Sequence, residues 1–149
     1  MKRPGVVIVG GGFAGLECAN ALDPREFAVT LVDAHAAFEF LPNIHELISG
    51  VKRPPELRLP FASAMKAAGH RFVRARVSSI DPQGRSVRAG RRRLTADYLV
   101  IAVGAVDADY GVSGVGRHAL GFKSVDQCQA IHERLEAIAG TKQSRVVIV

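Results

Sequence analysis

The chain has 149 residues, enough to bury a sizeable core, and its hydrophobic (48%) and charged (23%) fractions exclude wholesale disorder. No apolar run approaches the roughly 20 residues that cross a bilayer, and the glycine-punctuated stretch after the basic N-terminus reads as mature structure, not as a signal peptide. The net charge of +6 comes mainly from arginines in residues 71–93, which have few aromatic neighbours, so nucleic-acid binding is not expected.

The sequence opens with the pattern of a strand, a helix and a second strand. Residues 6–10 form a short unbroken apolar run, which is typical of a parallel strand buried on both faces. Residues 13–22 have apolar side chains at helical spacing and end before Pro24, since proline disfavours helical geometry in the preceding residue. Residues 27–33 are a β-branched run that finishes on an acid. Together they predict a βαβ unit.

The next segment is less regular. Residues 38–50 contain Pro42 and then a short helical pattern that stops at Gly50. Residues 52–60 contain three prolines and predict a loop, and the alanine-rich residues 62–69 predict a short helix.

From His70 the hydrophobic period switches to two, which predicts an antiparallel hairpin or a three-stranded meander over about residues 74–96. Its arginines are expected to form a solvated sheet face, with a phosphate-bearing ligand or an acidic membrane surface as the alternative. Residues 97–105 then return to the pattern of a buried parallel strand.

The last part of the chain begins with a glycine-rich connector, residues 107–118. Ser124 and Gln127 have the spacing of a capping box and open a helix that ends at Gly140. Residues 145–149 ("RVVIV") repeat the apolar letters of the first strand and predict another strand. The fold class expected from these elements is α/β, a Rossmann-like domain with a parallel sheet and a small antiparallel meander.

The strongest motif follows the first strand. Gly10, Gly12 and Gly15 fit G-x-G-x-x-G and open a helix, a context in which the glycines allow a tight turn, approach of a pyrophosphate and close helix packing. Asp33 lies about 20 residues further on, where a carboxylate can accept hydrogen bonds from a ribose and would repel a 2′-phosphate. The pattern predicts the ADP half of FAD or NAD and disfavours NADP. The alternative is a tight strand–helix turn with an unrelated acid.

These motifs resemble the flavoproteins that have two dinucleotide-binding domains, the pyridine nucleotide-disulfide oxidoreductase superfamily. Within it, the chain resembles the branch of type II NADH dehydrogenases and apoptosis-inducing-factor-like enzymes. The resemblance covers nearly the whole chain. It rests on "VVIVGGGFAGLECANAL", "VTLVD", "FEFLPNIHELISG", "VSSIDPQGRSV" and "DYLVIAVGA", the last with valine where the family's second flavin motif has threonine.

The resemblance implies a discontinuous flavin domain interrupted by an NADH domain. Residues 1–123 would be the N-terminal segment of the flavin domain, and residues 124–149 would be a linker helix and the first strand of the NADH domain. A complete member would be more than twice this length. The chain would then be a gene fragment, a split subunit or a shortened form, inactive alone. The alternative is that "VVIV" recurs by composition.

The resemblance also implies a cofactor, FAD, and roles for individual residues. The glycine turn would face the pyrophosphate, Asp33 the adenosine ribose, and the residue-77 backbone the adenine edge. The second flavin motif would line the phosphate and ribityl groups, and the segment after the second strand would approach the isoalloxazine. The expected cofactor-binding residues are Gly10, Gly12, Phe13, Ala14, Gly15, Asp33, Pro42, Asn43, Val77, Ala102 and Gly104.

The activity implied is hydride transfer from NADH to FAD and on to a quinone or another acceptor, and the alternative is a non-catalytic FAD- or ADP-binding module. Disulfide reduction is disfavoured because no cysteine pair follows the second strand. A complementing C-terminal chain or a homodimer is the expected partner, and any membrane contact would come through a C-terminal region. The expected location is cytoplasmic or peripheral at the inner face of the membrane.

Other reactive residues suggest little chemistry. His45, beside Pro42, is a candidate proton carrier, but a solvent-facing helix position is the preferred interpretation. Cys18 and Cys128 are expected to be reduced, packed thiols, and the histidines have no metal-ligand spacing. No catalytic residue is assigned and no metal is expected.

Overall fold

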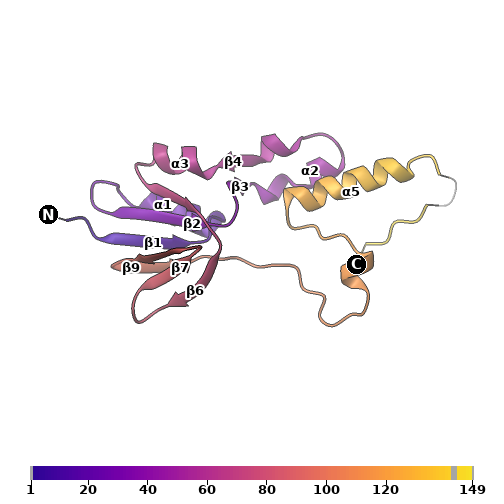
Figure 1. Ribbon diagram of the computed structural model, residues 1–149. Coiled ribbons are helices and arrows are strands. Elements are labelled where there is room, and N and C mark those ends of the chain that lie inside the picture. The colour runs from indigo at the N-terminus through magenta and orange to yellow at the C-terminus, as the bar shows by residue number, and fades with distance from the viewer. Residues whose placement is uncertain (1, 142–143, 149) are drawn as a thin grey trace. The chain divides into compact units, whose positions relative to one another are not determined.

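The computed structural model describes residues 2–141 and 144–148 (Figure 1). The chain divides into two compact units. The sheet unit comprises Met1–Phe38 and Leu59–Ala105, and the helical unit comprises Glu39–Arg58 and Val106–Val149. The boundary predicted at residue 123 separates two cofactor-binding domains, whereas these units are defined by their compactness. The predicted boundary therefore stays a prediction.

The sheet unit is built on a four-stranded parallel sheet in the order β5-β2-β1-β9. Its strands are β1 (Gly5–Val9), β2 (Ala28–Asp33), β5 (Arg71–Arg74) and β9 (Tyr98–Ile101). β1 pairs in parallel with both β2 and β9, and β2 pairs with β5. The parallel direction predicted for β1, β2 and β9 is therefore confirmed.

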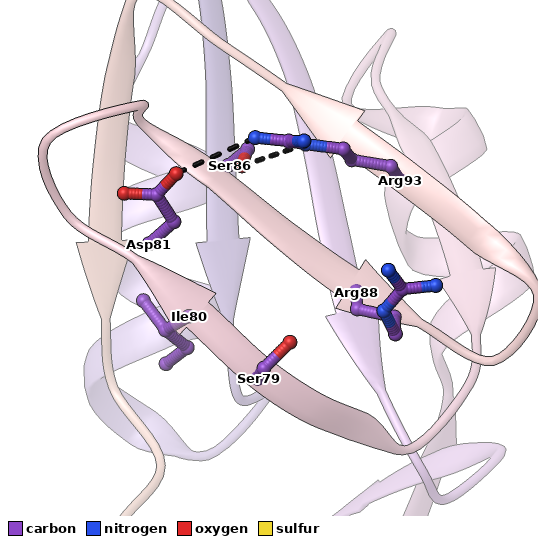
Figure 2. A pocket seen from close by; sticks show the side chains of 6 residues that line it. All are labelled: Ser79, Ile80, Asp81, Ser86, Arg88 and Arg93. Carbon is purple, nitrogen blue, oxygen red and sulfur yellow. Dashed lines mark hydrogen bonds and ion pairs between the residues drawn. The ribbon is translucent and has the colours of Figure 1, made fainter.

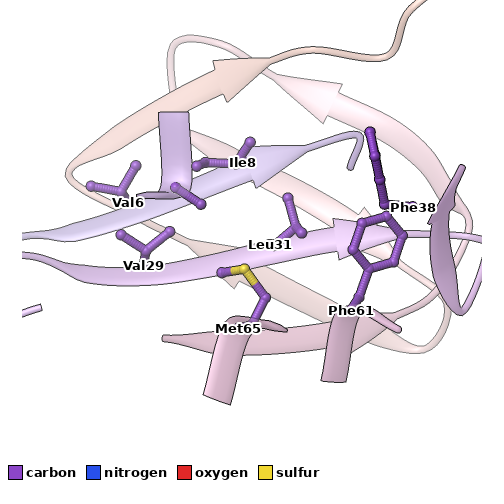
Figure 3. Packing of buried hydrophobic residues seen from close by; sticks show 8 residues of the cluster. Val6, Ile8, Val29, Leu31, Phe38, Phe61 and Met65 are labelled. Atoms are coloured by element: carbon purple, nitrogen blue, oxygen red, sulfur yellow. The ribbon is translucent and has the colours of Figure 1, made fainter. Parts of the chain in front are cut away.

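Helices cover one face of the sheet. Alternate residues of β1 and β2 point to this face, where α1 (Phe13–Ala21) and α3 (Phe61–Ala67) pack against them. The resulting core cluster is shown in Figure 3 and consists of Val6, Ile8, Ala19, Val29, Leu31, Phe38, Phe61 and Met65.

A three-stranded antiparallel meander covers the other face. It consists of β6 (Val77–Asp81), β7 (Ser86–Ala89) and β8 (Arg92–Thr95), which confirms the predicted meander. Val87 and Ala89 of β7 pack against the side of the sheet formed by Val7, Val9, Val32 and Val73. Helices, parallel sheet and meander are thus three layers of the α/β class.

Two strand predictions need correction. β5 lies inside the period-two segment, yet it pairs in parallel with β2, because alternation reports a half-buried strand and not the direction of its partner. β9 was expected to be buried, but Tyr98 and Ile101 are more than half exposed. Among the described residues β9 pairs only with β1, so it is an edge strand.

The proline-rich residues 52–60 were expected to be a loop, and this prediction is wrong. They form the 3₁₀ helix η2 (Pro54–Leu57) and the strand β4 (Arg58–Pro60), which pairs with β3 (Ala37–Glu39). Pro54 suits the first helical position, where its missing N–H is not needed.

The helical unit contains η1 (Leu41–Asn43), α2 (His45–Ile48), α4 (Val115–His118) and α5 (Val125–Ile138). Its core is Ile44, Leu47, Leu57, Val125 and Cys128. The predicted cap of α5 is half confirmed. Ser124 Oγ accepts a hydrogen bond from Gln127 N (3.2 Å), but the Gln127 side chain accepts from Lys123 N and not from the cap residue.

The strand expected at residues 145–149 is absent from the described part, residues 144–148, which has no ladder partner. Val147 and Ile148 are exposed. Apolar, β-branched composition predicts a strand only where a sheet offers a partner. Val149 lies outside the described residues. Among those described, no helix has the length and hydrophobicity of a transmembrane span.

Candidate functional site

The carboxyl ends of β1 and β9 meet at a reversal of strand order. From β1 the chain continues to β2 on one side, while β9 lies on the other side of β1. In open parallel α/β sheets, ligands bind outside the carboxyl ends of the strands at this kind of switch point. The glycine motif begins at this point, directly after β1.

Gly10 closes the contact between neighbouring strand ends. Its N–H donates to Val32 O (2.8 Å), and its φ of +99° is in the region that favours glycine. A Cβ added there would lie 2.2 Å from Ala102 O. Gly10 is therefore required by the fold, because it lets the backbones after β1 and β9 touch.

Gly15 allows α1 to approach the same turn. An added Cβ would lie 1.8 Å from Gly10 O, and Gly15 is buried. The third glycine of the motif thus serves helix packing, as its position in the pattern predicts.

Gly12 is different, because the fold makes no demand on it. It is the N-cap of α1 with a φ of −66°, and none of the described atoms lies within 4 Å of an added Cβ. As a glycine it provides no capping side chain, and no acid occupies the first turn of α1. An exposed helix N-terminus of this kind attracts an anion through its N–H groups and its dipole.

Asp33 ties the glycine turn to the end of β2. Its Oδ2 accepts from Gly11 N (2.7 Å), and its Oδ1 accepts from His35 N (2.7 Å) and lies 3.0 Å from His35 Nδ1. A carboxylate has about four acceptor sites, so capacity remains for further donors. The structure thus brings Asp33 and the glycine turn together, as the sequence pattern predicts.

Several predicted residues flank this turn. Phe13 stacks edge to face on Phe38, with ring centroids 4.8 Å apart, and Ala14 is exposed beside it. Ala102 follows β9 and donates to Val9 O (2.8 Å). Gly104 has a φ of +71°, which explains a glycine at that position of the second motif.

Val77 begins β6, on the segment that leaves the sheet beside Asp33. Ala75 N donates to Asp33 O (2.8 Å), so the segment that connects β5 to Val77 is hydrogen-bonded to the backbone of Asp33. The Val77 side chain is half-buried against the meander-side core. The adenine contact expected of its backbone stays a prediction.

Pro42 and Asn43 belong to η1 of the helical unit, and the glycine turn belongs to the sheet unit. The flavin contact expected of Pro42 and Asn43 stays a prediction. His45 is exposed at the start of α2, which agrees with the solvent-facing helix position that the sequence analysis preferred. Glu46 pairs with Lys52 (2.9 Å), and this hydrogen bond lowers the pKa of Glu46.

Two residues that the sequence analysis did not select complete the turn. Gly11 is buried, and a Cβ added there would lie 2.3 Å from Cζ of Phe61. Three consecutive glycines are a visible signal for Gly11. No local signal identifies Phe61, because it comes from α3, far along the chain.

A hollow of about 230 Å³ lies on the outer face of the meander (Figure 2). Arg93 crosses it, donating to Ser86 Oγ (3.1 Å) and pairing with Asp81 (3.4 Å). None of the predicted site residues lines it, and the Asp81 carboxylate would repel a phosphate. We therefore do not assign the nucleotide to this hollow.

Metal and thiol chemistry find no support in the described residues. No group of three histidine, cysteine or acidic side chains there could hold a metal ion. Cys18 and Cys128 are free, and burial raises the pKa of the Cys128 thiol, with a smaller contribution from the charge of Glu39.

Comparison with known proteins gives consistent matches. The model of the family described as pyridine nucleotide-disulphide oxidoreductase matches residues 4–149. Demethylphylloquinone reductase NdbB of Synechocystis sp. is 29% identical over 160 residues, which cover 99% of this chain and 40% of that protein. Type II NADH:quinone oxidoreductase of Staphylococcus aureus is 26% identical over 138 residues, covering 90% of this chain and 34% of that protein.

Solved structures have the same fold. The sulfide:quinone oxidoreductase of Aquifex aeolicus superposes with a TM-score of 0.84 at 23% identity, over 94% of this chain and 33% of that one. NDH2 of Plasmodium falciparum in complex with NADH superposes with a TM-score of 0.83 at 22% identity, over 96% of this chain and 32% of that one. The chain thus spans 34–40% of the length of the first two relatives.

Proposed function

The chain belongs to the pyridine nucleotide-disulphide oxidoreductase family, and from this premise we propose that its sheet unit holds the ADP half of FAD. One observation carries the proposal. Gly12 lies exposed at the N-terminus of α1 with open space where a side chain would be, although its backbone φ would suit any residue. A glycine that the fold does not need is explained by a ligand that approaches the backbone.

The neighbouring residues supply the other contacts of this ligand. The backbone at Gly12, Phe13 and Ala14 faces the diphosphate, with Gly10 and Gly15 holding the turn in shape. The remaining acceptor sites of Asp33 take the ribose hydroxyls, and its negative charge discriminates against a 2′-phosphate.

The remaining parts of FAD lie along the other predicted residues. The backbone at Val77 borders the adenine, and Ala102 and Gly104 border the phosphate and ribityl groups. Pro42 and Asn43 approach the isoalloxazine. When bound, the flavin supplies the redox chemistry, accepting a hydride and passing electrons on, while the protein positions and orients it.

For the whole protein we propose oxidation of NADH with transfer of electrons to a quinone or similar acceptor. The names of the relatives support this choice, since both include a quinone or a phylloquinone derivative. The absence of a cysteine pair in residues 34–43 argues against disulfide reduction. A cytoplasmic protein, or one held peripherally at the inner face of the membrane, fits this activity.

The test is a titration of the FAD-free protein with FAD, followed by quenching of flavin fluorescence, with FMN as the matched control. FMN has the isoalloxazine but lacks the ADP half. We expect FAD to bind at least about tenfold more tightly than FMN, because the diphosphate and ribose contacts supply the affinity. ADP should compete with FAD. Equal affinity for FMN and FAD, or no competition by ADP, would contradict the proposal.

A non-catalytic module that holds FAD or ADP is the second candidate. Anaerobic addition of NADH to the FAD-loaded protein separates the two. Loss of the flavin's visible absorbance indicates hydride transfer. An unchanged spectrum with tightly bound FAD indicates a binding module.

A further inference from the structure

Gly11 is held from two sides. Its N–H donates to Asp33 Oδ2 (2.7 Å), and its Cα faces the edge of the Phe61 ring. A Cβ at Gly11 would lie 2.3 Å from Cζ and 2.6 Å from Cε1 of Phe61. Real Cβ atoms do not approach other atoms this closely, so the ring sets the place of the Gly11 backbone.

Phe61 is itself fixed from several directions. It is 2% exposed, and Figure 3 shows its ring pointing from α3 into the core beside Leu31 and Phe38. Its N–H donates to Ala36 O (3.0 Å), and its ring packs on Phe72 with centroids 5.1 Å apart. The side chain therefore cannot move away from Gly11 without disturbing the core.

These contacts connect the two loops that make the site. The ring of Phe61 touches the turn after β1, and its backbone is bonded to the segment after β2, three residues beyond Asp33. The hydrogen bond from Gly11 N to Asp33 is a second connection between the turn after β1 and the end of β2.

We propose that Phe61 is a positioning residue of the nucleotide site, an inference that rests on the proposed function. The ring holds Gly11 so that its N–H is bonded to Asp33 and the following N–H groups are aimed outward at the diphosphate. Phe61 touches no part of the ligand. It acts through Gly11 on both the glycine turn and the ribose-binding acid.

A double-mutant cycle between Gly11 and Phe61 tests this inference. The φ of Gly11 lies outside the left-handed region, so the obstacle to Gly11→Ala is the ring and not the backbone conformation. We expect Gly11→Ala to weaken FAD binding about tenfold, since the turn must shift to relieve the overlap. Phe61→Leu removes the atoms in the way, so the double variant should regain most of that loss.

Met65→Ala is the matched control for loss of core packing. Met65 lies on the same helix and is completely buried in the same cluster. The three atoms nearest to a Cβ added at Gly11 all belong to Phe61 and none to Met65. Combined with Gly11→Ala, it should lower the melting temperature without restoring FAD affinity. Affinities are measured at a temperature where every variant is folded.

The FAD-free protein gives an independent readout, the exchange rate of the Gly11 amide hydrogen. It should be slow in the unchanged chain and faster in Phe61→Leu. The amide of Leu16, bonded to Gly12 O (2.9 Å), should change little. Failure of Phe61→Leu to rescue Gly11→Ala, or unchanged exchange at Gly11, would overturn the inference. If the unchanged chain binds no FAD, the proposed function itself fails, and this inference with it.

Discussion

Four glycines lie within the six positions of the turn, residues 10–15, and the space beside their Cα atoms differs. An added Cβ would meet backbone atoms at Gly10 and Gly15 and an aromatic ring at Gly11, but none of the described atoms within 4 Å at Gly12. Gly12 is therefore the one of these four positions where the fold does not require a glycine. At this scale, the difference between a structural glycine and a ligand-binding glycine is the atom that an added Cβ would meet.

This difference predicts that two similar substitutions change stability by very different amounts. Without FAD, Gly15→Ala should lower the free energy of unfolding by about 3 kcal/mol, because its Cβ would overlap Gly10 O. Gly12→Ala should change the free energy by less than about 0.5 kcal/mol. Urea unfolding of the two variants is the measurement, and equal destabilisation would contradict the assignment.

The contribution of the Asp33 negative charge to FAD affinity can be measured separately from its hydrogen bond to Gly11. Asp33→Asn keeps an acceptor for Gly11 but loses the negative charge, so FAD affinity should fall about tenfold, as for hydrogen bonds to charged groups. Asp81→Asn removes the same charge from the meander and should leave FAD affinity within about twofold. An Asp33→Asn protein that binds FAD like the unchanged chain would exclude the ribose role.

The Cys128 thiol should be unreactive in the folded protein. Burial raises its pKa, so the thiolate that reacts with alkylating reagents is scarce at neutral pH. Iodoacetamide labelling followed by mass spectrometry should modify Cys128 only after denaturation. Labelling of the folded chain at the rate of the denatured one would show that the core of the helical unit is not closed around it.

At the scale of elements, the meander is attached to the sheet through apolar contacts. Val87 is 1% exposed, and Arg88, its neighbour on β7, points outward. Val87→Ala removes two buried methyl groups and should cost about 2 kcal/mol of unfolding free energy. Arg88→Ala should cost less than about 0.5 kcal/mol. Similar losses in both variants by urea unfolding would contradict this packing.

Elements with a strong local pattern could be predicted from the sequence, and elements defined by a partner could not. The run before Gly10 and the helix opened by Ser124 carry their own signals, a continuous apolar stretch and a cap. β4 lies among prolines and exists because β3 pairs with it. Residues 145–148 show the converse, since apolar composition without a partner forms no strand in the described structure.

At the scale of the molecule, the strand order creates the site. Because β9 lies beside β1, Ala102 touches Gly10, although nearly the whole sheet unit separates them in sequence. Motif spacing placed Gly10, Gly12, Gly15 and Asp33 together in advance. The ring of Phe61 could not be predicted, since its contact with Gly11 depends on how α3 packs.

The most direct test compares FAD binding by the unchanged chain and by Gly12→Val, with the melting temperature of each FAD-free protein as the control. We expect Gly12→Val to melt within about 2 °C of the unchanged chain, since the space is open, yet to bind FAD at least about a hundredfold more weakly, since the branched side chain blocks the diphosphate. A Gly12→Val protein that retains the affinity of the unchanged chain would contradict the nucleotide site.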